Sequence, residues 1–299
     1  MWNRSLAADP TTLGWLRDCV LLDPNFDPDG LRVATVGEQL VGAAYAVRRL
    51  TPHAGTELDP DTGWVPFFFV DPDHRGQGVG GRLLTEALGF LRAAGRSRVE
   101  FAPYTPYYVL PGIDEVAYPA GFALLTKLGF STLYSPVAMD RSLVGYAVPP
   151  EVRALRAERE AGGYAFTTPT AGDLPELVAF AAAEFAPDWG EAIRDSVHRG
   201  TPLDRFVVAW QGDRIVGFAT YGAYQGVRER FGPFGVEAGQ RGTGLGKILL
   251  HETMTRMRAE GLHTSWFLWT GEQSPAGHLY KAAGYEVTRQ FHVMRRTEP

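Results

Sequence analysis

The sequence predicts an α/β protein with a mixed (α+β) sheet, built from two tandem copies of one domain. An apolar run, a glycine-rich turn and a helix occur together twice, with Arg241 aligning with Arg75 at an offset of 166 residues. In each copy a short hairpin precedes this unit and strand–helix alternation follows it, which favours a mixed sheet flanked by helices. The length of 299 residues is typical of about two domains.

The second copy carries the clearest signal. The apolar run at 231–236 leads into a turn and then a helix that ends at Gly261, a residue type that commonly follows a helix. Leu250, Met254 and Met257 follow the helical period. Free amides and the positive end of a helix dipole meet at such a turn, so it predicts an anion site. The turn residues are Arg241, Gly242, Thr243, Gly244, Leu245 and Gly246.

The first copy repeats this pattern with the same helix length. Its apolar run is 67–70, its helix ends at Gly95, and its turn consists of Arg75, Gly76, Gln77, Gly78, Val79 and Gly80. Hairpins at 37–42 and 212–217 also match, as do the turns at Gly129 and Gly284. A repeat of this length indicates two whole domains rather than a solenoid.

Along the first copy we expect a helix at 11–22 whose apolar face, Leu13, Leu16, Cys19 and Val20, packs in the core. The copy holds two insertions, a polar one at 51–63 and a stiff, tyrosine-rich one at 103–114. The second either lines a pocket or fills space where no helix lies. The other expected elements are strands at 32–36, 41–47, 67–70 and 98–101, a helix at 120–128, and strands at 131–133 and 136–140.

A charged helix after Pro149-Pro150 predicts a linker, so the expected domains are 1–145 and 164–299, with a linker at 146–163. In the second domain we expect strands at 164–168, 205–210, 214–221, 231–236, 264–269, 286–289 and 291–295, and helices at 171–185, 190–198, 245–260 and 274–283.

Composition excludes several classes of protein. The net charge is −5 and no run of Lys or Arg exists, which argues against nucleic-acid binding. No apolar run reaches the roughly 18 residues that span a bilayer, and the amino terminus lacks the apolar core of a signal peptide. The single cysteine, Cys19, cannot form an intrachain disulfide, which fits a reducing cytoplasm. We therefore expect a cytoplasmic protein without nucleic-acid or membrane partners.

The order R-x-x-G-x-G between strand and helix, at 75–80 and 241–246, resembles the phosphate-binding signature of the GNAT superfamily of acyl-CoA-dependent N-acetyltransferases. The resemblance covers nearly all of the second domain and most of the first. It implies two tandem GNAT domains, acetyl-CoA as co-substrate, no metal, and a small-molecule amine as acceptor. The segment 110–114 with Tyr118-Pro119 is faintly similar to loops of tandem acetyltransferases that act on glucosamine, so an amino sugar is one candidate acceptor.

The resemblance assigns the cofactor-binding residues. Backbone groups of Gly242 to Gly246 would hold the diphosphate of CoA while Arg241 adds charge, and Arg75 with Gly76 to Gly80 would do the same in the first domain. A backbone amide near Phe234, Gly235 and Val236 would polarise the thioester carbonyl. The alternative for the first domain is that its turn survives only as a turn.

The catalytic acid is expected at Tyr280. The segment 278–285, HLYKAAGY, resembles the GNAT pattern in which a tyrosine protonates the departing thiolate. A phenol with a pKa near 10 suits a thiolate of similar basicity. The alternative is that Tyr280 only packs on an amphipathic helix. Leu125 occupies the matching position of the first domain and cannot donate a proton.

The sequence does not single out one residue as the general base. Glu272 and Glu229 are the candidates, with deprotonation through water as the alternative. The sequence thus predicts an N-acetyltransferase that works by direct transfer in a ternary complex, with the second domain catalytic. The rival function is a non-enzymatic acyl-CoA-binding or sensor protein. A homodimer is an open alternative.

Overall fold

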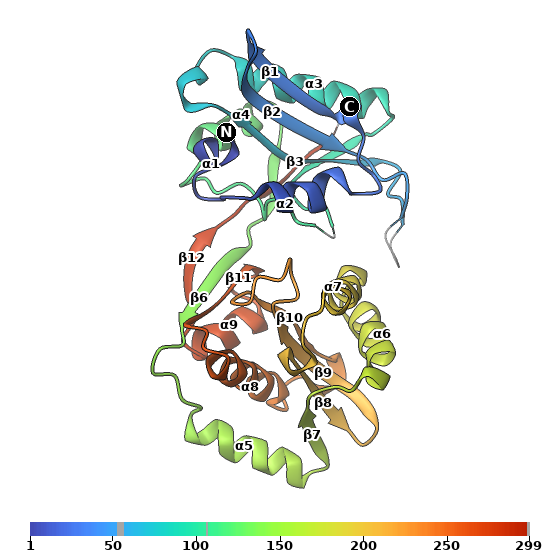
Figure 1. The fold of residues 1–299 in the computed structure, drawn as a ribbon, viewed down its shortest axis with the longest axis vertical. Helices are drawn as coiled ribbons and strands as arrows, with labels where there is room; N and C mark the ends of the chain where they lie inside the picture. The colour runs from blue at the N-terminus through green and yellow to red at the C-terminus, as the bar shows by residue number, and fades with distance from the viewer. Residues whose placement is uncertain (53–56, 106, 298–299) are drawn as a thin grey trace. The chain divides into compact units, whose positions relative to one another are not determined.

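The computed structural model describes residues 1–52, 57–105 and 107–297. The chain forms two compact units (Figure 1). Residues 1–136 with the segment from Arg289 onward form the N-terminal unit, and residues 137–288 form the C-terminal unit. Part of the first expected insertion, 53–56, and Pro106 of the second lie outside the described residues.

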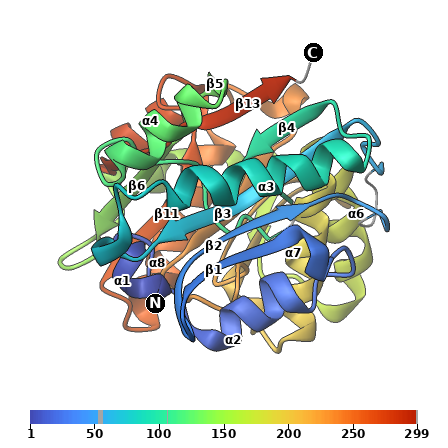
Figure 2. The same ribbon diagram turned by 90° about the horizontal axis from the view of Figure 1, so that it is seen from above.

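The N-terminal unit is built on a six-stranded sheet in the order β1-β2-β3-β4-β13-β5. Only β3 and β4 pair in parallel; the other neighbours are antiparallel. Figure 2 shows α3 lying along β2 and β3. The strands are β1 (Leu31–Val36), β2 (Gln39–Val47), β3 (Thr62–Val70), β4 (Arg98–Phe101), β5 (Ser131–Tyr134) and β13 (Val293–Thr297), and the helices are α1 (Trp2–Ser5), α2 (Leu13–Leu16), α3 (Val79–Ala93) and α4 (Pro119–Lys127).

The C-terminal unit contains two sheets, β10-β9-β8-β7 and β11-β6-β12. Helices α8 and α9 cover one face of the strands, and α6 and α7 cover the other (Figure 1). The strands are β6 (Val137–Ser142), β7 (Tyr164–Thr167), β8 (Phe206–Gln211), β9 (Arg214–Tyr221), β10 (Phe231–Val236), β11 (Thr264–Thr270) and β12 (Glu286–Gln290), and the helices are α5 (Pro150–Ala161), α6 (Leu174–Glu184), α7 (Pro187–His198), α8 (Leu245–Ala259) and α9 (Pro275–Ala282). Within the described residues, none of the helices has the length and apolarity that crossing a membrane requires.

The compact units divide the chain differently from the domains expected at 1–145 and 164–299. The strand expected at 136–140 is β6, which pairs with β11 in the C-terminal unit. The strand expected at 291–295 is β13, which lies between β4 and β5 in the N-terminal unit. These are the final strands of the two repeats, so each unit receives its last strand from the other copy. The local pattern of a strand does not encode which sheet it joins.

The returning strand β13 is anchored by the second insertion. Ile113 forms a bridge with His292, exchanging backbone hydrogen bonds of 3.0 and 2.8 Å. Gly112 has φ +150°, and a Cβ there would lie 2.8 Å from Cβ of Phe291. Asp114 accepts a hydrogen bond from Arg289 at 2.8 Å. Residues 112–114 of the insertion therefore fix residues 289–292, which lead into β13.

One helix differs from the sequence-based expectation. Residues 11–22 form the short helix α2 followed by a π-helical turn, η1 (Arg17–Leu21), rather than one continuous helix. Cys19 and Val20 are buried as expected, but Leu13 is 86% exposed, so its predicted core role is wrong. The π turn inserts one residue per turn and rotates the apolar face away from Leu13.

Candidate active site

The glycine turn of the C-terminal unit joins β10 to α8. Gly242 and Gly244 have φ of +81° and +86°, left-handed values that favour glycine. Among the described residues, nothing accepts a hydrogen bond from the amides of Gly242, Gly244, Leu245 and Gly246. Since these amides sit at the positive end of α8, the turn offers a cluster of donors to an anion.

The turn of the N-terminal unit has the same backbone shape but a different arginine. Gly76 and Gly78 have φ of +75° and +81°. The Arg75 guanidinium donates to the carbonyls of Val70 at 3.2 Å and Ser5 at 2.8 Å. The Arg241 guanidinium has no hydrogen bond or ion pair with any described residue, so its charge is available to a ligand.

The other polar side chains of the two turns donate hydrogen bonds to backbone carbonyls three or four residues earlier in the chain. The Thr243 hydroxyl donates to the Gln240 carbonyl at 2.6 Å, and the Gln77 amide donates to the Asp73 carbonyl at 3.4 Å. Leu245 is fully buried in the core. The backbone is therefore what each turn presents outward, as the sequence predicts for a phosphate site. Val79 and Gly80 open α3 as Leu245 and Gly246 open α8.

Strands β10 and β11 diverge and form a V. Within the described residues they share only a bridge between Arg230 and Trp266, where the Trp266 amide donates to the Glu229 carbonyl at 3.1 Å. Beyond this point β10 belongs to one sheet and β11 to the other. The N-terminal unit shows the same divergence, since β3 runs to Val70 but its pairing with β4 ends at Val65.

The register of β10 shows which of its backbone amides point toward β9 and which point toward the open edge of the V. The Glu237 amide donates to Val216 of β9 at 3.0 Å, and Gly235 pairs with Phe218. Backbone groups alternate in direction along a strand, so the amide of Gly235 also faces β9. The amides of Phe234 and Val236 face the open edge of the V. A Cβ on Gly235 would lie 2.3 Å from the Phe185 ring, so this glycine makes room for that ring.

Tyr280 lies on α9 beside the V and is 7% exposed. Its ring centroid is 4.3 Å from that of Phe267 and 6.0 Å from those of Phe231 and Phe234. No described residue hydrogen-bonds its hydroxyl. Burial raises the pKa of Tyr280 far above its ordinary value, so the phenol keeps its proton. Leu125, at the matching position of α4, is fully buried.

The two candidate bases differ in their surroundings. The Glu272 carboxylate pairs with the Lys281 ammonium at 2.7 Å, and both side chains are more than a third exposed. Glu229 lies at the base of the V, is half-buried, and has no side-chain partner among the described residues. Glu229 therefore lies where β10 and β11 begin to diverge, whereas Glu272 belongs to a surface ion pair.

Sequence reasoning missed a polar group at the base of the V, made of Asp188, Tyr224 and Arg230. The Arg230 guanidinium carbon lies 4.4 Å from the Tyr224 ring centroid. Asp188, in the first turn of α7, is 8% exposed. The sequence did contain a signal for this group. Side chains alternate between the two faces of a strand, so Arg230, next to the buried Phe231, is expected on the opposite face.

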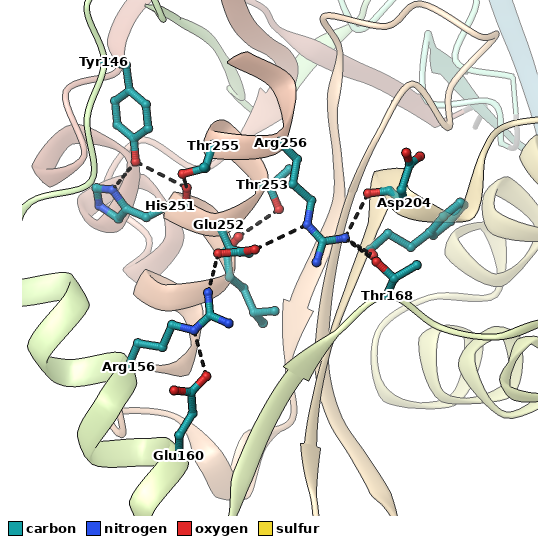
Figure 3. A network of polar contacts seen from close by, with 12 residues as sticks. Tyr146, Arg156, Glu160, Thr168, Asp204, His251, Glu252, Thr253, Thr255 and Arg256 are labelled. Carbon is teal, nitrogen blue, oxygen red and sulfur yellow. Dashed lines mark hydrogen bonds and ion pairs between the residues drawn. The ribbon is translucent and has the colours of Figure 1, made fainter. Parts of the chain in front are cut away.

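Residues in the middle of α8, His251, Glu252 and Arg256, take part in a polar network. The Tyr146 hydroxyl and His251 Nδ1 lie 2.7 Å apart, and Glu252 pairs with Arg156 at 2.6 Å (Figure 3). Arg256 Nη1 donates to the carbonyls of Asp204 and Phe206 at 2.9 Å each. The described part of the chain holds no group of three metal-ligating side chains.

Comparison with known proteins gives a consistent result. The model of the Acetyltransferase (GNAT) family matches residues 3–108 and 172–285. Mycothiol acetyltransferases of Streptomyces scabiei (strain 87.22) and Rhodococcus opacus (strain B4) are each 27% identical, over 90% and 89% of this chain and 81% and 82% of their own lengths.

Solved structures share the fold. A GCN5-related glucosamine N-acetyltransferase region of a fungal multi-domain GH3 β-N-acetylglucosaminidase has a TM-score of 0.77 at 19% identity; the match covers 99% of this chain but only 36% of that one. A GCN5-related N-acetyltransferase from Sphaerobacter thermophilus has a TM-score of 0.70 at 18% identity, covering 99% and 90%. A tandem GNAT protein of the clavulanic acid biosynthesis pathway has a TM-score of 0.63 at 16% identity, covering 98% and 92%.

Proposed function

Because the chain belongs to the acetyltransferase (GNAT) family and is an acyltransferase, we propose that its C-terminal unit transfers an acetyl group from acetyl-CoA to a primary amine of a small molecule, by direct attack within a ternary complex. The observation that carries this proposal is the buried Tyr280 phenol, without a hydrogen-bond partner among the described residues, beside the open edge of β10. The relatives are named for mycothiol and a fold neighbour for glucosamine. These names support a small acceptor, with an amino sugar as the first amine to test.

Acetyl-CoA supplies the activated acetyl group, as a thioester. The free amides of Gly242, Gly244, Leu245 and Gly246, with Arg241, bind its diphosphate. The amide of Phe234 or Val236 donates to the thioester carbonyl and stabilises the charge that develops on its oxygen. As the amine nitrogen bonds to the acetyl carbon and the carbon–sulfur bond breaks, Tyr280 gives its proton to sulfur and recovers one from solvent. The ammonium proton leaves to Glu229 or to water.

The N-terminal unit has a different proposed role. Leu125 cannot donate a proton, and Arg75 is engaged by two carbonyls. The unit keeps the turn but lacks the acid, which supports a binding role without catalysis. This is the unit to which the acyl-CoA-sensor hypothesis applies.

The test is a thiol-release assay with a panel of amines on the wild type and Tyr280→Phe. We expect the variant to lose kcat by roughly 10²- to 10⁴-fold, the range for a positioned acid, with an unchanged KM for acetyl-CoA. Tyr285→Phe is the matched control. It removes a phenol of the same cluster whose hydroxyl lies 2.6 Å from that of Ser265, so it should lower stability more than kcat.

Two results would count against the proposal. Tyr280→Phe with wild-type kcat would remove the phenol from the chemistry. A wild type that binds CoA with micromolar affinity and turns over no amine would favour the sensor function.

A further inference from the structure

Gly235 of β10 leaves a space that an aromatic side chain from another element fills. A Cβ on Gly235 would lie 2.5 and 2.8 Å from Cε1 and Cε2 of the Phe185 ring, so this ring lies directly against the strand backbone. Phe185 follows the last residue of α6, and Pro187 begins α7, so the ring comes from the short connection between these helices. At the matching position of the first repeat stands Phe69, whose own side chain packs against Trp2 at 5.6 Å.

The Phe185 ring is held in this position by its neighbours. Its centroid lies 5.0 Å from that of Trp189 in a stacked pair, and 5.8 and 6.0 Å from those of Phe180 and Phe218 in edge-on pairs. Gly190 lets α7 approach α6 closely, because a Cβ there would lie 2.9 Å from a side chain of α6. Three ring contacts and a tightly packed helix pair restrict the ring, so it is a fixed part of this face.

Phe185 and Tyr280 lie on opposite faces of β10. Gly235 pairs with Phe218 of β9, whose ring packs in the cluster formed with α6 and α7. The two residues that flank Gly235 in β10 pack in the other cluster, together with Tyr280, as the alternation of side chains along a strand requires. The amides of these two flanking residues point toward the open edge of the V. They therefore lie between the phenol on one face and the Phe185 ring on the other.

We propose that Phe185, supported by Trp189, covers the thioester site on the face opposite Tyr280 and keeps water from the acetyl group, so that transfer to the amine outcompetes hydrolysis. The inference rests on the proposed function for the position of the thioester at the edge of β10. In hydrolysis the oxygen of water bonds to the acetyl carbon and the carbon–sulfur bond breaks. One proton of the water goes to sulfur and the other to solvent, which leaves CoA and acetate. Excluding water from a reaction centre suppresses such side reactions.

The test measures how much of the released thiol comes from hydrolysis. Thiol release from acetyl-CoA is recorded without an amine, and then with each amine of the panel, where the acetylated product is counted against the thiol. We expect Phe185→Ala to raise the amine-independent rate roughly tenfold and to lower the yield of acetylated amine per thiol. Phe185→Leu, which keeps apolar volume without the flat ring, should give an intermediate rate.

Phe180→Ala is the matched control. It removes a half-buried ring of the same cluster that contacts Phe185 and Phe218, whereas the three atoms nearest to the Cβ position of Gly235 all belong to Phe185. It should lower stability while leaving the amine-independent rate at the wild-type value. Thermal melting of each variant verifies that it folds.

Gly235→Ala addresses the same contact from the strand. Its methyl group would occupy the space of the Phe185 ring, so it should displace the ring and raise the amine-independent rate as Phe185→Ala does. Added to Phe185→Ala, the same substitution should change the rate little, because the ring that it would displace is already absent.

The inference is overturned if folded Phe185→Ala and Phe185→Leu hydrolyse acetyl-CoA no faster than the wild type. It is also overturned if Phe180→Ala hydrolyses acetyl-CoA as fast as Phe185→Ala, as a general loosening of the unit would produce. Faster hydrolysis by Phe185→Ala alone, in a protein that acetylates no amine, would support the inference and refute the proposed function.

Discussion

Tyr280 and Leu125 occupy matching positions in the two repeats, and both are buried, at 7% and 0% exposure. Either side chain satisfies the packing of its helix against the sheet, so burial alone does not explain the tyrosine. The hydroxyl is the difference, and no described residue bonds it. The hydroxyl oxygen is not among the buried unpartnered atoms of the described residues, so it reaches solvent, where it can donate its proton to a ligand.

His251 gives a residue-scale prediction about pH. Burial first, and then the charges of Arg141 and Lys247, lower its pKa to about 4. The unfolded chain binds a proton near pH 6.5 but the folded chain does not, so the stabilisation is complete above pH 6.5 and is lost as the pH falls toward 4. We expect the free energy of unfolding to fall by about 1.4 kcal/mol per pH unit in this window from this residue. Urea unfolding between pH 4 and 7 measures it.

The comparison that isolates this effect is His251→Gln, which should flatten the pH dependence in that window. His263→Gln alters an exposed histidine of the same unit and should keep the wild-type slope. Equal slopes for His251→Gln and the wild type would mean that His251 does not titrate as described.

At the scale of elements, the two glycine turns share a backbone but not their surroundings. A Cβ on Gly78 would meet nothing within 4 Å, whereas a Cβ on Gly244 would lie 2.7 Å from Leu155 of α5. Helix α5 therefore packs against the second turn, and Arg156 ties it to Glu252 of α8. The helix expected as a linker is part of the C-terminal unit and packs against its glycine turn.

This difference predicts unequal costs for one substitution. Gly78→Ala should cost about 1–2 kcal/mol, because alanine is strained at positive φ. Gly244→Ala should cost about 1 kcal/mol more, because Leu155 must also move. Urea unfolding measures the free energies, and calorimetry with CoA reports the effect on binding. Equal losses in the two variants would show that α5 does not restrict the second turn.

At the scale of the whole molecule, the chain passes between the two units twice, because each unit contains the final strand of the other repeat. Arg289, where the chain re-enters the N-terminal unit, pairs with Asp9 and Asp114 at 2.8 Å each. Phe291, Val293 and Met294 are almost completely buried there. The N-terminal unit therefore depends on the last residues of the chain.

We predict that removing residues 291–299 unfolds the N-terminal unit. Burial of each large apolar side chain contributes about 1.5–3 kcal/mol. The free energy lost with these three side chains is therefore comparable to the net stability of a whole domain. Strands β4 and β5 also lose their shared partner. Hydrogen exchange at β4 and β5 measures the loss, and a synthetic peptide of residues 289–297 added in trans should restore protection. A truncated chain with full-length protection would contradict this dependence.

The sequence by itself determined the repeats, the two glycine turns, most helices and strands, and the contrast between Tyr280 and Leu125. These features are local: the freedom of glycine and the helical period act within a few residues. Only the tertiary structure decided that β6 and β13 change sheets, that the amides of Phe234 and Val236 face the open edge, and that Arg75 is engaged while Arg241 is not. Each of these depends on a partner distant in the chain, and a local pattern does not specify its partner.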